Sequence, residues 1–166
     1  MRNLQELGRP AAEILVATGA TVAVAESSTA GLISAALLAV PGASAYYRGG
    51  SVIYTLEARR ELLGIRRADV EGLEPLTEEM TARFAARAKE QLDATWAISE
   101  LGVAGPTPAR YGHAPGISVL AVAGPSPMTR VLETGSDDRE ANMWRFTEAA
   151  LTLLVEALIA TDRGTS

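Results

Sequence analysis

The sequence contains no cysteine and a single histidine, His113. Without cysteine the chain forms no disulfide and no thiolate metal site, and it offers no thiol nucleophile. A single histidine also argues against a zinc site or a catalytic triad that depends on a histidine-rich motif. We therefore expect a domain that binds no metal ion and needs no cofactor.

Positive charge is in short supply, since 15 lysines and arginines stand against 20 aspartates and glutamates, for a net charge of −5 and a pI near 5.0. Binding to nucleic acid requires clustered positive charge, so we expect no nucleic-acid partner. The longest apolar stretches, residues 32–40 and 149–160, are too short to cross a bilayer. The N-terminus also lacks the apolar stretch of a secretory signal. The sequence thus predicts no membrane association and a cytoplasmic location.

The remaining composition is that of an ordinary globular protein, with 48% apolar and 21% charged residues in 166. This length favours one domain over residues 1–166. Apolar periodicity predicts helices over residues 3–18, 31–40, 57–63, 77–92 and 138–160, and strands over residues 21–25, 51–55, 95–99, 117–122 and 128–133. Pro10 is expected either to kink the first helix or to start a second one.

The order of these elements predicts the fold class. Helices separate the first three strands, which favours parallel crossover connections. The short segment 123–127 between the last two strands favours an antiparallel hairpin. We therefore expect an α/β fold, a three-layer α/β/α sandwich with a mixed, mostly parallel sheet of about five strands.

Residues 26–31, with the sequence ESSTAG, follow a buried strand and open a helix. At such a junction free backbone N–H groups point toward an anion, and the hydroxyls of Ser27, Ser28 and Thr29 add further donors. The alternative is that one hydroxyl simply caps the helix. Three successive hydroxyls after Glu26 exceed the need of one cap, so both interpretations stay open.

A second candidate segment, residues 100–107, follows the third predicted strand and contains Gly102 and Gly105. Glycines allow the backbone to approach a ligand closely, although the segment is also typical of an ordinary connector. Glu100 is expected at the end of its strand, as Glu26 is at the end of the first. If the two strands are neighbours, the carboxylates face each other and one of them has a raised pKa.

Three further residues carry weaker signals. Arg59 lies one turn beyond a strand end, where a guanidinium can hold a phosphate or carboxylate, although Glu57 offers it a local partner. His113 lies in a loop rich in proline and glycine and is either a general base or an ordinary surface residue. Arg139 belongs to the acidic start of the last helix and is a further candidate phosphate ligand.

Several of these segments combine with others in a specific order: residues 25–32 (AESSTAGL), 41–44 (PGAS), 50–54 (GSVIY), 57–59 (EAR), 63–64 (LG), 102–106 (GVAGP) and 138–140 (DRE). In this order they resemble the C-terminal domain of the CinA family, the competence/damage-inducible proteins. Characterised members of that family hydrolyse the amide of nicotinamide mononucleotide. The resemblance covers nearly the whole chain, and its specificity lies in the collinear order of motifs that are individually loose.

The resemblance implies a metal-free amide hydrolysis that yields nicotinic acid mononucleotide and ammonia. It implies Ser27 as the nucleophile, Tyr54 as the strand-end tyrosine and Gly105 as part of the ligand loop. Together with the residue patterns described above, this gives Ser27, Tyr54, Arg59 and Glu26 as the expected catalytic residues. The expected substrate- or phosphate-binding residues are Ser28, Thr29, Ala30, Gly31, Gly105, Thr107 and Arg139.

The chain departs from the family pattern at several positions. Ser28 stands where the family usually has cysteine, and Ala30 stands where it has a second glycine. Leu56, Leu101 and Met143 replace residues that are usually Asn, Ser or Thr, and Arg respectively.

Arg59 stands where the family usually has lysine, and this departure bears on the chemistry. Arginine stays protonated at any working pH, so Arg59 can anchor an anion but cannot act as the base that a neutral lysine provides. The proton acceptor must then be Glu26, Glu100 or His113.

Three hypotheses follow. The first is a hydrolase of nicotinamide mononucleotide or a related phosphorylated amide. The second is a catalytically silent relative that binds a nucleotide or phosphate, and the third is a structural or regulatory interaction module. In the first two the partner is a small phosphorylated molecule. The family likeness and the alanine-rich helices also lead us to expect a homo-oligomer, with a dimer first.

Overall fold

The structure, a computed structural model, describes residues 3–164. Its α-helices are α1 (Leu4–Thr18), α2 (Leu32–Leu38), α3 (Leu56–Leu63), α4 (Glu78–Gln91) and α5 (Arg139–Gly164), with short 3₁₀ helices η1 (Ala43–Ala45) and η2 (Arg67–Val70). Its strands are β1 (Val22–Glu26), β2 (Tyr47–Val52), β3 (Trp96–Val103), β4 (Ile117–Ala123) and β5 (Met128–Glu133).

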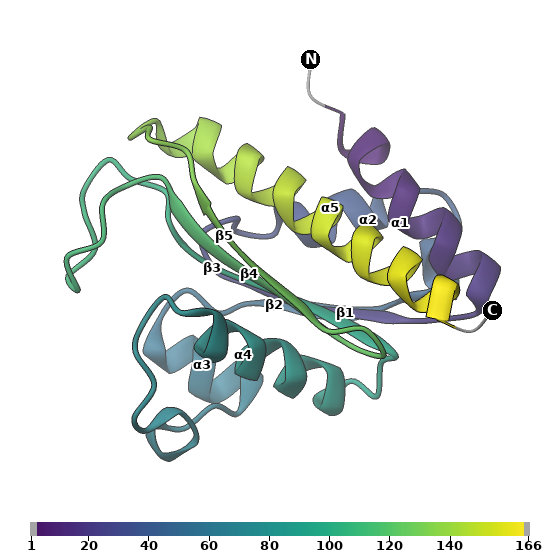
Figure 1. Cartoon of the computed structure of the whole chain (residues 1–166), viewed down its shortest axis with the longest axis horizontal. Helices are drawn as coiled ribbons and strands as arrows, with labels where there is room; N and C mark the ends of the chain where they lie inside the picture. Colours follow the sequence, from purple (N-terminus) through teal and green to yellow (C-terminus); the bar gives the residue numbers. More distant parts are fainter. Residues whose placement is uncertain (1–2, 165–166) are drawn as a thin grey trace.

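The strands form one sheet in the order β2-β1-β3-β4-β5. Helices α1, α2 and α5 cover one face of this sheet, and α3 and α4 cover the other (Figure 1). The expected α/β fold, with a mixed five-stranded sheet between helices, is therefore confirmed. We name the two sides the α5 face and the α4 face.

The expectation of a mostly parallel sheet is wrong. Strand β1 pairs in parallel with β2 and β3, but β3–β4 and β4–β5 are antiparallel. The physical reason lies in the connection between β3 and β4, residues 104–116, which contains no helix. A parallel neighbour needs a crossover, usually through a helix, so β4 returns beside β3 in the opposite direction.

Two predicted strand boundaries also differ from the structure. Strand β2 runs from Tyr47 to Val52 rather than over residues 51–55, and Tyr54 follows the strand instead of ending it. Strand β3 continues to Val103, so Glu100 lies inside the strand and not at its end. Glycines in β2, and Glu100 with Gly102 in β3, have low strand propensity, so the sequence pattern did not predict a strand at these residues. Tertiary contacts hold them in extended form.

The helix ends follow the local sequence. The Thr77 side chain accepts the N–H of Met80 and caps α4, as its position predicts. Gly19 ends α1 with φ of 66°, the left-handed conformation that favours glycine. Pro10 lies within α1, which continues as one helix from Leu4 to Thr18 rather than beginning a second one.

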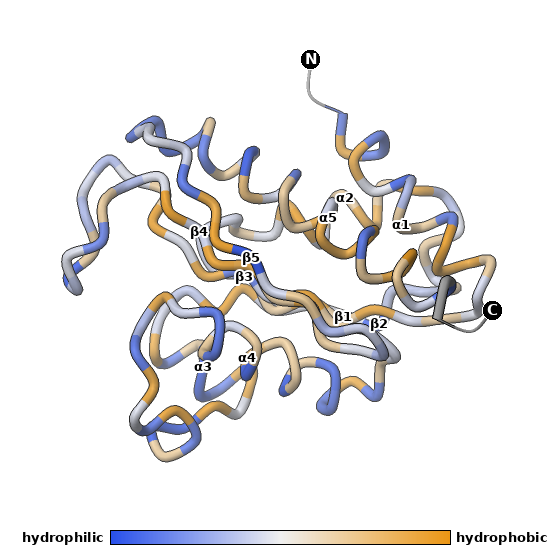
Figure 2. Tube along the Cα trace, in the orientation of Figure 1, coloured by the Kyte–Doolittle hydropathy of each residue, from blue (hydrophilic) through white to orange (hydrophobic). Residues whose placement is uncertain are grey.

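The core has two parts, one on each face of the sheet. Along β1, Val22 and Val24 belong to the α5-face cluster, and Ala23 and Ala25 to the α4-face cluster, as the alternation of a strand requires. Figure 2 shows the hydrophobic residues concentrated on the strands and the helix turns beside them. Within residues 3–164, no helix combines the length and apolar character needed to cross a membrane.

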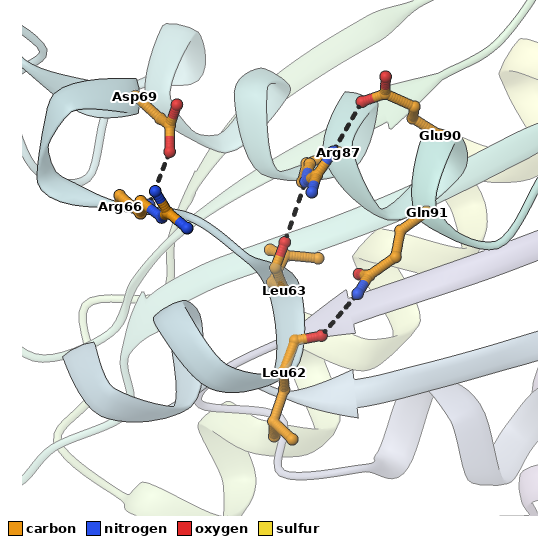
Figure 3. A network of polar contacts seen from close by, with 7 residues as sticks. All are labelled: Leu62, Leu63, Arg66, Asp69, Arg87, Glu90 and Gln91. Carbon is orange, nitrogen blue, oxygen red and sulfur yellow. Dashed lines mark hydrogen bonds and ion pairs between the residues drawn. The ribbon is translucent and has the colours of Figure 1, made fainter.

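Helix α3 is fixed to α4 at its C-terminal end (Figure 3). Gln91 donates from Nε2 to the carbonyl of Leu62 at 3.2 Å, and Arg87 donates from Nε to the carbonyl of Leu63 at 3.1 Å. Arg87 also contacts Glu90 through Nη1 at 3.0 Å. These bonds satisfy carbonyls that the end of a helix leaves without intrahelical partners. They therefore hold α3 in place at one side of the candidate site.

Candidate functional site

The candidate site is an open cavity of about 800 Å³ beyond the carboxyl end of β1. Its walls come from the β1–α2 loop, the start of α3, the segment entering α4, the end of β3 with its following loop, and the start of α5. Seven of the eleven predicted site residues line it: Ser27, Ser28, Tyr54, Arg59, Gly105, Thr107 and Arg139. The other four, Glu26, Thr29, Ala30 and Gly31, do not.

The β1–α2 loop is folded around the carboxylate of Glu100. Oε2 of Glu100 accepts the backbone N–H of Ser27 at 3.0 Å and that of Thr29 at 3.1 Å. Oε1 accepts the hydroxyl of Ser28 at 2.5 Å and that of Ser118 at 3.3 Å. The amides that the sequence offers to a bound anion are thus partly occupied by an anion of the protein itself, supplied from β3.

Glu26 has a similar structural role at the start of α2. Its carboxylate accepts the N–H of Ile33 at 3.1 Å, the N–H of Ser34 at 3.0 Å and the Ser34 hydroxyl at 2.8 Å. It also accepts the hydroxyl of Thr29 at 2.6 Å. A carboxylate placed at the N-terminal end of a helix satisfies free N–H groups and complements the helix dipole. Glu26 is fully buried and lies outside the cavity.

Glu26 and Glu100 are direct cross-strand neighbours, because β1 pairs with β3. Both side chains are fully buried. Burial raises the pKa of Glu100 above its ordinary value of 4.5, and the Glu26 charge raises it further, while hydrogen bonds from Ser28 and the loop amides act in the opposite direction. Desolvation dominates because the interior disfavours the charged form. The predicted pairing of the two carboxylates is therefore present, and Glu100 is the one with the raised pKa.

The two serines of the loop differ in their surroundings. Both line the cavity, with Ser27 5% and Ser28 3% exposed. The Ser28 hydroxyl donates to Glu100, whereas the Ser27 hydroxyl has no hydrogen-bond partner among residues 3–164. The backbone N–H of Ala30 donates to the Ser27 carbonyl at 3.1 Å and closes the turn. Gly31 then forms the N-cap of α2.

Arg59 projects into the cavity from α3 without an acidic partner in the described part of the chain. Its Nε donates to the carbonyl of Ile53 at 3.4 Å, and its guanidinium lies 5.2 Å from the centroid of the Phe84 ring. Burial lowers its pKa from the ordinary value, with an opposing contribution from Tyr111. The group still remains a cation near neutral pH. Local pairing with Glu57, the alternative considered from the sequence, is not formed.

Arg139 contacts two other predicted site residues, Gly105 and Tyr54, in the cavity wall. Its Nη1 donates to the carbonyl of Gly105 at 2.7 Å, and its Nη2 contacts the hydroxyl of Tyr54 at 3.5 Å. Gly105 has φ of 101°, and a Cβ there would lie 2.8 Å from the carbonyl oxygen of Asp137. Glycine is therefore required where the β3–β4 loop meets the start of α5.

The cavity is positively charged although the protein is acidic overall. Arg59, Arg110 and Arg139 line it, and none of its lining residues is Asp or Glu. This contrasts with the net charge of −5 for the whole sequence. Unpaired guanidinium groups at a concave surface provide charge-assisted hydrogen bonds to phosphate or carboxylate. The cavity is thus electrostatically suited to an anionic ligand.

Several site features were missed in the sequence. Arg110 and Tyr111 line the cavity from the β3–β4 loop, where only the density of proline and glycine hinted at a structured segment. Leu76 and Met80 contribute an apolar wall from the entry to α4. His113, the third candidate base, does not line the cavity. No group of three or more His, Asp or Glu side chains with metal-binding geometry occurs in the part of the chain that the structure describes.

The chain matches the CinA C-terminal domain over residues 4–158. It is 34% identical over 162 residues to a CinA-like protein of Chlorobium phaeobacteroides, an alignment that covers 94% of this chain and 38% of that relative. A CinA-like protein of Gloeobacter violaceus is 33% identical over 156 residues, covering 92% of this chain and 36% of that relative. The chain therefore spans less than two fifths of the length of these curated relatives.

Solved structures agree with this relationship. A CinA superfamily protein from Klebsiella pneumoniae superposes with a TM-score of 0.87 and 28% identity, covering 96% of this chain and 99% of that chain. The competence/damage inducible protein CihA of Agrobacterium tumefaciens gives a TM-score of 0.85 and 26% identity, with 95% and 96% covered. From the match to the domain, the aligned relatives and the shared fold, we conclude that the chain belongs to the CinA C-terminal domain family.

Proposed function

We propose that this protein hydrolyses the amide of nicotinamide mononucleotide, or of a related phosphorylated amide, to the acid and ammonia. The observation that carries the proposal is a cavity lined by two serines and three arginines and by no acidic residue. The serines supply hydroxyl nucleophiles for the amide carbon. The arginines supply the positive charge that a phosphate requires.

The arginines lie on different elements around the serines. Arg59 comes from α3, Arg110 from the β3–β4 loop and Arg139 from α5, while Ser27 and Ser28 lie in the β1–α2 loop. A ligand held by its phosphate at one of these cations has its remaining part near the serines. Fixing the ligand in this way reduces the entropic barrier to attack on the amide. The apolar wall at the entry to α4 suits the uncharged part of such a ligand.

The alternative is a catalytically silent relative that binds a phosphorylated ligand. One observation favours it: Arg59 stacks on Phe84 in the cavity wall and stays protonated, so it cannot serve as a neutral amine base. Such a protein retains the anion-binding cavity without turnover. Ligand binding alone therefore does not distinguish the two functions, and a product assay is needed.

The test measures ammonia release from nicotinamide mononucleotide by the purified protein, together with calorimetric binding of the same nucleotide. Turnover that disappears in the double variant Ser27→Ala/Ser28→Ala, with binding retained, supports the hydrolase. Binding without turnover supports the silent relative. If the protein neither binds nor turns over the nucleotide, both the hydrolase and the silent relative are rejected, and the interaction module is favoured. Ser44→Ala, which changes a serine outside the cavity, is the matched control.

A further inference from the structure

The geometry points to Ser28 and Glu100 as the nucleophile and general base of this site. The Ser28 hydroxyl donates to Oε1 of Glu100 at 2.5 Å, and Ser28 lines the cavity. A nucleophile within hydrogen-bond reach of a base is the arrangement that activates a serine. Ser27, the position that the family resemblance implies, has no base bonded to its hydroxyl among the described residues. The inference depends on the proposed function only for the identity of the substrate.

The two oxygens of Glu100 have different tasks. Oε2 accepts the N–H groups of Ser27 and Thr29 and so holds the loop in shape. Oε1 accepts only hydroxyls, those of Ser28 and Ser118. A proton can therefore bind at Oε1 while the bonds that anchor the loop at Oε2 remain. This division separates the structural role of the carboxylate from a role in proton transfer.

The environment of Glu100 suits a base that works near neutral pH. The side chain is fully buried, and burial raises its pKa above the ordinary value of 4.5. A general base is most effective when its pKa approaches the working pH. Glu26 is the titratable side chain opposite it on β1, while the neighbouring groups from the loop and β4 are hydroxyls and amides.

Gly102 lies beside the pair at the cavity wall, where Ser28 lines the cavity and the fully buried Glu100 lies behind it. Gly102 lines the cavity, and a Cβ added there would lie 2.5 Å from Oγ of Ser28 and 2.6 Å from Oε1 of Glu100. The absence of a side chain at Gly102 thus leaves the space into which these two atoms project. Glycine allows such a close approach of side chains to the backbone.

The chemistry balances within the pair. Oγ of Ser28 bonds to the amide carbon as its proton passes to Oε1 of Glu100. The C–N bond then breaks, and the nitrogen takes that proton and leaves as ammonia. Water attacks the resulting ester, giving its proton to Glu100, and Glu100 returns the proton to Oγ of Ser28 as the carboxylic acid departs.

The test uses a fluorophosphonate, a serine-directed reagent that does not depend on the amide substrate. Mass spectrometry of the labelled, digested protein locates the adduct. We expect it on Ser28, with labelling lost in Ser28→Ala and retained in Ser27→Ala. Glu100→Gln should slow labelling by about 100-fold or more, the usual contribution of a general base. An adduct on Ser27, no adduct, or an unchanged rate in Glu100→Gln would overturn the inference.

Controls separate a loss of base from a loss of fold. Ser99→Ala alters the adjacent buried serine of β3, whose hydroxyl has no partner in the described residues, and should leave the labelling rate unchanged. Thermal melting verifies that each variant is folded. If Glu100→Gln unfolds, Ser28→Ala serves as the test of the pair, because it leaves the bonds at Oε2 of Glu100 in place. Labelling of Ser28 without ammonia release from the nucleotide would retain the pair and reject only the proposed substrate.

Discussion

Glu26 and Glu100 share a single hydroxyl, that of Thr29, which lies 2.6 Å from Oε2 of Glu26 and 3.1 Å from Oε2 of Glu100. A hydroxyl has one proton to donate, so it cannot satisfy both carboxylates at once. The two acidic groups occupy paired positions on β1 and β3 and are fully buried. The Thr29 hydroxyl therefore lies between the two buried carboxylates, at the loop that carries the serines.

Stability should therefore depend on the protonation of Glu100. Its pKa is raised in the folded state, mainly by burial, so the folded chain holds this proton more tightly than the unfolded chain. The stabilising contribution is complete below the ordinary value of 4.5 and is lost as the pH rises through the folded pKa. Glutamine does not titrate. The free energy of unfolding of wild type minus that of Glu100→Gln should decrease as the pH rises from 4.5, measured by urea denaturation.

The control for this pH series is Glu140→Gln, which removes an exposed carboxylate from the first turn of α5. It measures how the free energy of unfolding responds to the loss of a surface carboxylate while Glu100 is intact. A difference for Glu100→Gln that is flat, or that increases with pH, would contradict the raised pKa.

Arg59→Ala should lower the affinity of the protein for phosphate-containing ligands. Arg59 lines the cavity and has no acidic partner within residues 3–164, so its charge is available to a ligand. A hydrogen bond to a charged group contributes about 1.5–3 kcal/mol, which corresponds to roughly 10- to 100-fold in affinity. Calorimetry with nicotinamide mononucleotide measures the change.

The matched control is Arg60→Ala, because Arg60 is the next residue on α3 but is exposed and paired with Glu61 outside the cavity. Its affinity should remain within a factor of about two, as expected for an exposed surface pair. Equal losses in Arg59→Ala and Arg60→Ala would show that long-range charge, and not a contact in the cavity, governs binding.

Gly102→Ala should separate Ser28 from Glu100. The added methyl group would lie 2.5 Å and 2.6 Å from the two bonded oxygens, and 3.1 Å from the Ile117 carbonyl oxygen, so these groups must move. Overpacking of this kind costs about 1–3 kcal/mol, and a displacement of about 1 Å in a catalytic group lowers rates about 100-fold. Fluorophosphonate labelling and urea denaturation measure the two effects. A stable variant that labels at the wild-type rate would argue against the pair.

Arg87→Ala should loosen α3 from α4. The substitution removes the bond from Nε to the Leu63 carbonyl and the ion pair with Glu90. A hydrogen bond of this kind contributes about 1 kcal/mol, and the partly exposed ion pair adds little. We expect the free energy of unfolding to fall by about 1 kcal/mol in urea denaturation. Arg67→Ala, at an exposed position of η2, should change it by less than about 0.5 kcal/mol.

The elements that sequence analysis predicted best were those specified by local chemistry. Thr77 and Gly19 mark helix ends because capping depends on one side chain or one backbone conformation. Strand β2 was misplaced because Gly49 and Gly50 disfavour a strand locally. At Gly50 a Cβ would lie 2.6 Å from the Tyr47 hydroxyl, so glycine fits there without displacing that side chain.

Part of the lining of the candidate cavity was predicted from the sequence, but not its arrangement. Ser27, Ser28 and Arg59 were identified because polar and cationic residues after strand ends are typical of ligand sites in α/β folds. The occupation of the loop amides by Glu100 was not predicted, because a free N–H and one bonded to a distant carboxylate have the same local sequence.

The sequence by itself determined what this protein lacks and which residue types are available to it: no thiol chemistry, an acidic chain, a hydroxyl-rich loop before a helix, and glycine at the turns that need it. These are properties of composition and of neighbours along the chain. Only the tertiary structure decided that Ser28 bonds to a carboxylate 72 residues away, and that three arginines line the same cavity as Ser28. The parallel pairing of β1 with β3 sets that contact, and strand pairing results from packing of the whole sheet rather than from any local segment.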